Sequence, residues 1–146
     1  MDARSKLFLV LASISINAYA GENAGDKLLE IRQLPSDEME LAFRKLDYKE
    51  KIELFFEANR RHPPYSGLND AFGKEGKPFL VSLRRELDSR GGVPEVLSFL
   101  VILSKLKRQG DLSSEDMGEL RVKGICQLAH QSRYCPELEG KLLAPK

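Results

Sequence analysis

Two histidines and the residues around the first of them are the side chains best suited to catalysis. His62 precedes Pro63-Pro64, with Ser66 and Asp70 a few positions further along, and His130 lies far from them. A serine–histidine–aspartate triad requires these groups to converge in space, which short separation across a proline-rich loop does not provide. We expect His62 to face solvent, Ser66 and Asp70 to serve turns and caps, and His130 to close a helix end.

Other catalytic patterns are weak or absent. Glu53 with Glu57, and Glu115 with Glu119, offer paired acids for glycoside hydrolysis, but charged neighbours flank both pairs and indicate solvated helix faces. No H-E-x-x-H, EF-hand or G-x-S-x-G pattern occurs. Gly73-Lys74-Glu75-Gly76-Lys77 lacks the strand and the Gly-Lys-Ser/Thr ending of a P-loop. We interpret it as a turn, with anion binding at the next helix start as the alternative. We expect no metal and no cofactor.

The stretch over residues 60–70, which begins with Arg60 and Arg61, is the strongest candidate for a recognition surface. The candidate binding residues are Arg60, Arg61, His62, Tyr65 and Asn69. Arginine and tyrosine supply many binding hot spots, and the adjacent prolines lower the cost of ordering a loop. The alternative is an ordinary surface connection in which Tyr65 packs back on the core. Phe72 is expected to anchor this loop.

Helical periodicity dominates the segments that must position these residues. Apolar side chains recur every three to four positions from Asp26 onward, and no segment alternates as a strand does. The residues expected to mark helix ends are Ser36, Asp47 with Glu50, Gly110, and Ser113 with Asp116. The expected helices cover 26–34, 37–46, 48–61, 78–90, 94–109, 114–130 and 136–143, with one helical turn near 68–72.

An all-α fold of about six to eight helices follows from these segments. The first expectation is a compact multi-helix bundle, and the alternative is a short α-solenoid of stacked helix pairs. The expected pairs are 48–61 with 66–72, 78–90 with 94–109, and 114–130 with 136–143. Their lengths resemble HEAT-type repeats of about 40 residues, in length and apolar period only.

Residues 1–20 are typical of a cleavable secretory signal peptide. Its parts are the basic Arg4 and Lys6, the apolar stretch from Leu7 to Ile16, and the cleavage pattern Ala18-Tyr19-Ala20. The apolar run is shorter than the ~20 residues of a membrane span. Residues 21–146 would then form one helical domain, with a flexible tail over 21–25. The short apolar core is typical of bacterial signals and predicts a periplasmic protein, with full secretion as the alternative.

Cysteine content and charge narrow the function classes. Cys126 and Cys135 are the only cysteines, and an even count in an exported chain predicts a disulfide. A metal pair or a redox dithiol is the alternative, although the C-x8-C spacing is typical of neither. Loss of residues 1–20 leaves 21 basic and 21 acidic residues of the original 23 and 22. This near neutrality argues against a nucleic-acid or anionic-membrane partner.

These observations predict an exported, non-catalytic protein-binding module. It would be of inhibitor or immunity type, acting in the periplasm, with another protein as its partner. The alternative is a small hydrolase of the cell envelope with a carboxylate or His62 in a cleft, and a third hypothesis is a structural subunit of a larger assembly. An enzyme would bring titratable groups together in one pocket, whereas a binder would expose an apolar patch.

Overall fold

The computed structural model describes residues 23–129 and 133–144. These residues form eight α-helices and one 3-10 helix with no strand among them, which confirms the all-α prediction. The elements are α2 (Ala24–Arg32), α3 (Ser36–Arg44), α4 (Tyr48–Arg60), α5 (Asn69–Lys74), α6 (Lys77–Arg90), α7 (Val93–Gln109), α8 (Ser114–Glu119), η1 (Ile125–Ala129) and α9 (Cys135–Leu143). The predicted signal peptide and His130 lie outside the described residues.

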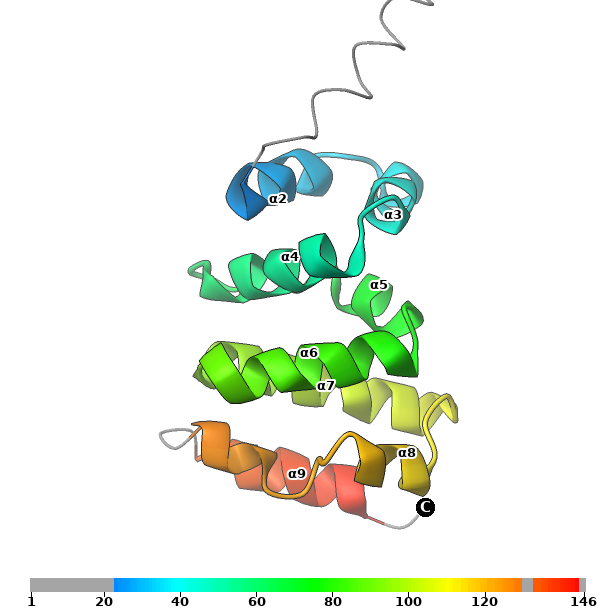
Figure 1. Ribbon diagram of the computed structural model, residues 1–146, viewed down its shortest axis with the longest axis vertical. Coiled ribbons are helices and arrows are strands. Elements are labelled where there is room, and N and C mark those ends of the chain that lie inside the picture. The colour runs from blue at the N-terminus through cyan, green and yellow to red at the C-terminus, as the bar shows by residue number, and fades with distance from the viewer. Residues whose placement is uncertain (1–22, 130–132, 145–146) are drawn as a thin grey trace, which may run out of the picture.

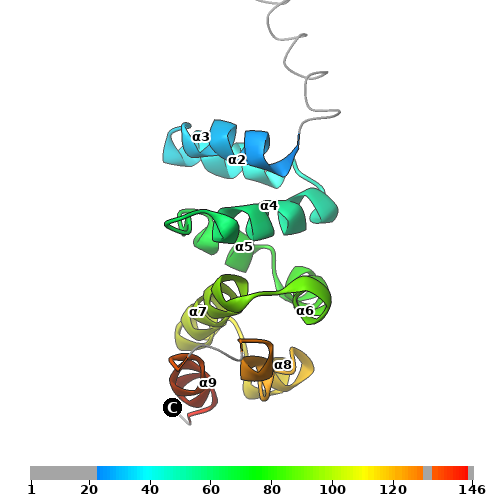
Figure 2. The ribbon, with the colours of Figure 1, turned by 90° about the vertical axis from the view of Figure 1, so that its left-hand side faces the viewer.

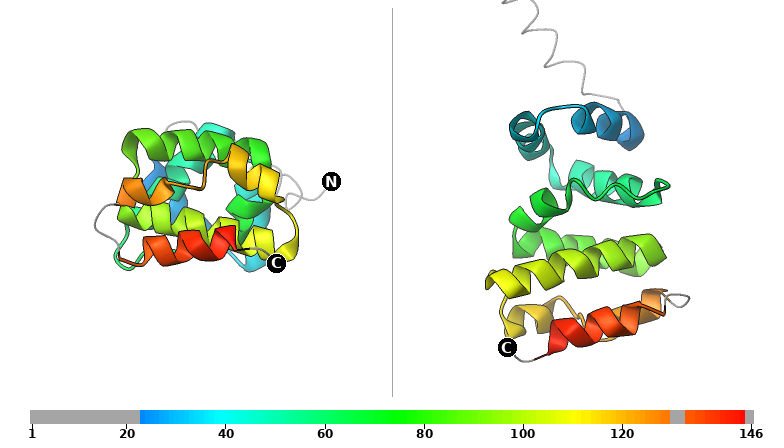
Figure 3. Two further views of the ribbon diagram at one scale, coloured as in Figure 1. Left: turned by 90° about the horizontal axis from the view of Figure 1, so that it is seen from below. Right: turned by 180° about the vertical axis from the view of Figure 1, so that it is seen from behind.

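The elements stack in chain order along the long axis of the molecule (Figure 1). Layer 1 holds α2 and α3, layer 2 holds α4 and α5, layer 3 holds α6 and α7, and layer 4 holds α8, η1 and α9. The principal contacts between elements join neighbours within one layer or in adjacent layers. Figure 2 shows α6 and α8 on one side of the stack and α7 and α9 on the other, and the right-hand view of Figure 3 shows the same stack from behind. Layers 2, 3 and 4 therefore correspond to the three helix pairs expected for a short α-solenoid, and layer 1 adds a further pair.

A cluster of four phenylalanines joins the first three layers. The Phe72 ring lies 5.1 Å from that of Phe43 and 5.3 Å from that of Phe55, both edge to face, and stacks 6.2 Å from that of Phe79. Phe72 is 1 % exposed, which confirms it as a core anchor. Because its three partners lie on α3, α4 and α6, this single residue of α5 connects the layers above and below it.

Most predicted helix ends are confirmed. Asp47 and Glu50 form the reciprocal capping box at the start of α4, with backbone N–H donors 2.8 and 2.9 Å from the two carboxylates. Gly110 ends α7 in the left-handed conformation, with φ of 84°. The expectation that Ser36 caps α3 is wrong, because Ser36 is the first helical residue and Pro35 holds the cap position without a side-chain bond.

The prediction of one helix over 114–130 is wrong. α8 ends at Glu119, and Arg121 takes the left-handed conformation with φ of 52°. The Arg121 N–H donates to Gly118 O at 3.0 Å and the Val122 N–H donates to Met117 O at 3.2 Å, the two bonds of a Schellman motif. Met117 and Val122 are both buried, so the apolar spacing continues through a turn and imitates a continuous helix.

The N-terminal end of the described chain also differs from expectation. α2 begins at Ala24, and Asn23 caps it by accepting a hydrogen bond from the Asp26 N–H at 3.0 Å. Residues 23–25, predicted as part of a tail, therefore belong to the start of a helix. Among the described residues, no helix combines the length and the apolar character needed to cross a membrane.

Candidate functional site

The predicted binding residues at the end of α4 face different neighbours. Arg60 is exposed and lies 3.9 Å from the Glu95 carboxylate at the start of α7. Arg61 pairs with Glu57 one turn back on α4, at 2.9 Å. His62 is exposed, as expected for a solvent-facing residue.

Tyr65 is half-buried and packs back on the stack. Its N–H donates to Ala58 O at 2.8 Å, and its hydroxyl lies 3.9 Å from Met39 Sδ on α3. The Arg32 guanidinium of α2 lies 5.1 Å from the ring centre. Gly67 lies so close to the ring that a side chain there would collide with it. Tyr65 thus fits the alternative interpretation of an ordinary connection whose tyrosine packs back on the protein: the loop joins α4 to α5 within layer 2 and packs against layer 1.

Asn69 is the one predicted binding residue that lines a groove. It begins α5 and accepts a hydrogen bond from the Ser98 hydroxyl of α7 at 3.2 Å. The five residues Arg60, Arg61, His62, Tyr65 and Asn69 therefore do not converge on one point, and their role as a common binding surface stays a prediction.

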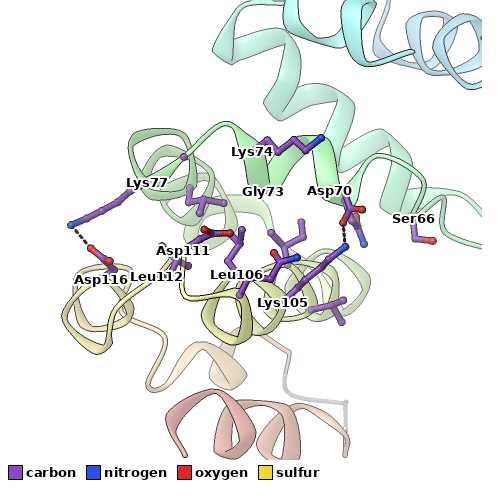
Figure 4. A pocket seen from close by; sticks show the side chains of 16 residues that line it. Ser66, Asp70, Gly73, Lys74, Lys77, Lys105, Leu106, Asp111, Leu112 and Asp116 are labelled. Atoms are coloured by element: carbon purple, nitrogen blue, oxygen red, sulfur yellow. Dashed lines mark hydrogen bonds and ion pairs between the residues drawn. The ribbon is translucent and has the colours of Figure 1, made fainter. Parts of the chain in front are cut away.

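A groove of about 900 Å³ lies between α5, the start of α6, α7 and the α7–α8 connection (Figure 4). Its apolar lining consists of Leu80, Val101, Ile102, Leu106 and Leu112. Val101 is 47 % exposed, although valine is usually buried in cores. Leu106 is half-buried and the other three are buried, so Val101 is the main apolar side chain that the groove exposes to solvent.

Four of the charged residues that line the groove are paired across its walls. Lys105 of α7 bonds to Asp70 of α5 at one end. Lys77 of α6 lies 2.9 Å from the Asp116 carboxylate of α8 at the other end, and it also pairs with Glu119. The partners Lys105 and Asp70, and Lys77 and Asp116, are 35 or more residues apart in the sequence. Asp111 lies between these two pairs and has no ion pair among the described residues (Figure 4).

The electrostatics of Asp116 do not suit a general acid. Hydrogen bonding to Lys77, followed by bonds from the Ser113 backbone and side chain, lowers the pKa of Asp116 to about 2. Glu119 and then Asp116 raise the pKa of Lys77 above its ordinary value. A carboxyl that donates a proton near neutral pH needs the opposite shift, which comes from burial without a cationic partner.

The glycine-rich turn forms one rim of the groove. Gly73 is buried in α5, where a Cβ would meet Leu106 and Ile102 of α7 at 3.4–3.6 Å. Gly76 caps α6 with φ of 84°, a conformation that favours glycine. The nearby Lys74 lies 3.4 Å from Glu40 of α3. The predicted turn is therefore a close crossing of α5 over α7 followed by a helix start.

Comparisons with known proteins add no relative. No family model, no curated protein and no solved structure matches this chain.

Within residues 23–129 and 133–144, no three histidine, cysteine, aspartate or glutamate side chains gather as a metal site would require. The groove is therefore identified from the geometry of this structure alone. Its apolar part had one signal in the sequence, because α7 carries more apolar residues than one buried face needs.

Proposed function

We propose that this chain is an exported, non-catalytic protein-binding module that contacts its partner through the groove along α7. The observation that carries this proposal is the half-exposed Val101 in a concave apolar floor between two cross-wall ion pairs. Exposed apolar surface in a concavity is typical of a recognition site. Export is supported by the signal-like residues 1–20 and by Cys126 and Cys135 at disulfide distance.

The paired charges favour a macromolecular partner over a charged small substrate. Lys77 and Lys105 already bond to carboxylates, so a strongly anionic ligand would have to displace Asp116 or Asp70. An apolar protein segment would instead cover Val101 and its neighbours while the ion pairs remain at the rim. The finer proposal is a periplasmic protein of inhibitor or immunity type, whose partner is another exported protein.

The test compares two apolar-to-aspartate variants of exposed residues. Val101→Asp places a charge in the groove, and Leu41→Asp makes the same kind of change on α3, where Leu41 is 57 % exposed and does not line the groove. A photo-crosslinker at position 101 of the exported protein identifies the partner, which is then purified. We expect Val101→Asp to raise the dissociation constant at least tenfold, which corresponds to a loss of about 1.4 kcal/mol of binding free energy. Leu41→Asp should leave the dissociation constant within twofold of the wild-type value.

Equal dissociation constants for the two variants would contradict the groove as the contact surface. Circular dichroism of both variants establishes that the helices persist. Mass spectrometry of the exported chain tests the localisation part separately, because cleavage predicts a mature N-terminus at Gly21 and an intact Met1 contradicts it.

A further inference from the structure

Two elements of layer 4, η1 and α9, pack on a single helix of layer 3. The principal contacts of η1 and α9 are with each other and with α7. Lys107 of α7 also donates to Leu142 O, and at 3.0 Å to Ala144 O, at the end of α9. In a linear stack each layer is stabilised by its neighbours, so a layer at the end of the described stack can open while the others stay folded.

The disulfide lies entirely within this layer. Cys126 in η1 and Cys135 at the start of α9 have Cα atoms 5.5 Å apart, and they are the two cysteines of the sequence. Cys135 is 1 % exposed, whereas Cys126 is half-buried. The Glu139 carboxylate of α9 supports the same junction, accepting hydrogen bonds from the Gly124 N–H at 2.7 Å and the Cys126 N–H at 3.4 Å.

We propose that the Cys126–Cys135 disulfide is a redox switch for this layer: its reduction by a dithiol lets η1 and α9 open from α7 while layers 1 to 3 stay folded. α8 remains on α6 through the ion pairs of Lys77 with Asp116 and Glu119. The proposal concerns the fold and does not depend on the groove binding a protein.

The chemistry of the switch is an ordinary thiol–disulfide exchange. A thiolate of the dithiol attacks Sγ of the more accessible Cys126, and Cys135 leaves as a thiolate that takes up a proton. The second thiol of the reductant then attacks the reductant sulfur that is bonded to Cys126 in the mixed disulfide, and Cys126 is released as a thiol. Two electrons and two protons pass to the protein, and the reductant ends as a cyclic disulfide.

The size of the effect follows from the length of the closed loop. A disulfide closes the chain from 126 to 135, a separation of nine residues. The loop-closure entropy for about ten residues predicts that reduction raises the equilibrium constant for the opening of η1 and α9 about 100-fold. Layers 1 to 3 contain no cysteine, and the Phe72 cluster holds them together independently of this bond.

Hydrogen exchange followed by mass spectrometry tests the proposal on the full mature chain, with and without dithiothreitol. We expect amides of α9 to exchange about 100-fold faster after reduction, and amides of α4 to change by less than twofold. The double variant Cys126→Ser, Cys135→Ser is the control, and it should exchange fast in α9 with or without the reductant. Trypsin supplies a second readout, since cleavage after exposed Lys141 should accelerate while the buried Lys27 and Lys51 stay protected.

Two results would overturn the proposal. An unchanged exchange rate in α9 after complete reduction would mean that the bond does not hold the layer. A common acceleration of α4 and α9 would mean that the chain opens as one cooperative unit and that no separate switch exists.

Discussion

The phenylalanine cluster makes a quantitative prediction about what holds the layers together. Phe72 and Phe99 are both fully buried, at 1 % and 0 % exposure. Phe72 packs against three aromatic rings, whereas Phe99 on α7 has no ring partner among the described residues. Phe72→Leu and Phe99→Leu therefore make the same chemical change at equally buried positions, but only Phe72→Leu removes interactions between aromatic rings.

The expected difference follows from the number of ring pairs. Each edge-to-face or stacked pair contributes about 0.5–1.5 kcal/mol beyond the area it buries, so three pairs correspond to about 1.5–4.5 kcal/mol. The three pairs share one ring, and interactions that share a residue are not fully additive. We therefore expect Phe72→Leu to lower the free energy of unfolding by about 2 kcal/mol more than Phe99→Leu does.

Urea unfolding followed by far-ultraviolet circular dichroism measures this difference for the two variants and the wild type. The slope of the free energy against urea concentration is a further readout, because a lower slope for Phe72→Leu would indicate that the layers unfold separately. Equal destabilisation by the two variants, within about 0.5 kcal/mol, would refute the role of the rings as the connection between layers.

Three further predictions concern single residues, each measured by urea unfolding. Gly76→Ala is expected to cost about 1 kcal/mol because its φ is 84°, whereas Gly73→Ala, whose Cβ meets ordinary contacts, should be neutral or stabilising; equal effects would contradict this. Arg121→Gly should stabilise by about 0.5–1 kcal/mol by relieving the left-handed conformation, and a loss of stability would count against it. Asp116, with a pKa lowered to about 2, stabilises the fold at higher pH and loses that contribution as pH falls through its folded pKa. The stability advantage of wild type over Asp116→Asn should therefore shrink between about pH 4 and pH 2, and a constant difference would be evidence against the Lys77 pair.

Local signals in the sequence predicted most of the helix ends. Asp47 with Glu50 and Ser113 with Asp116 form the expected capping boxes because both partners lie within one helical turn. Arg121 shows where such reasoning fails. A Schellman turn usually places glycine in the left-handed position, and an arginine there carries no sequence signal, so apolar periodicity alone extended the helix past its end.

The candidate site was harder to predict because distant segments build it. Asp70 meets Lys105 and Lys77 meets Asp116 across 35 to 39 residues, and no local pattern joins them. The loop after α4 shows the opposite case. Its arginines and tyrosine are close in sequence, but the backbone turns Arg61 toward Glu57 and Tyr65 toward Met39. Residue type alone therefore does not identify a surface when the chain reverses direction.

The exposed Lys105–Asp70 ion pair of the groove contributes little to stability. Lys105 and Asp70 are 45 % and 64 % exposed, and exposed pairs contribute about 0–1 kcal/mol at most. Stability alone thus gives little reason for pairs that span two layer boundaries. Their physical consequence is local: each pair leaves no lone charge at its own end of the groove when Val101 and its neighbours are desolvated. Asp111 is the exception, because it lines the groove without an ion pair among the described residues. The proposed protein partner would therefore cover the apolar residues at low electrostatic cost at both ends, and it would have to leave Asp111 in water or offer it a hydrogen-bond donor.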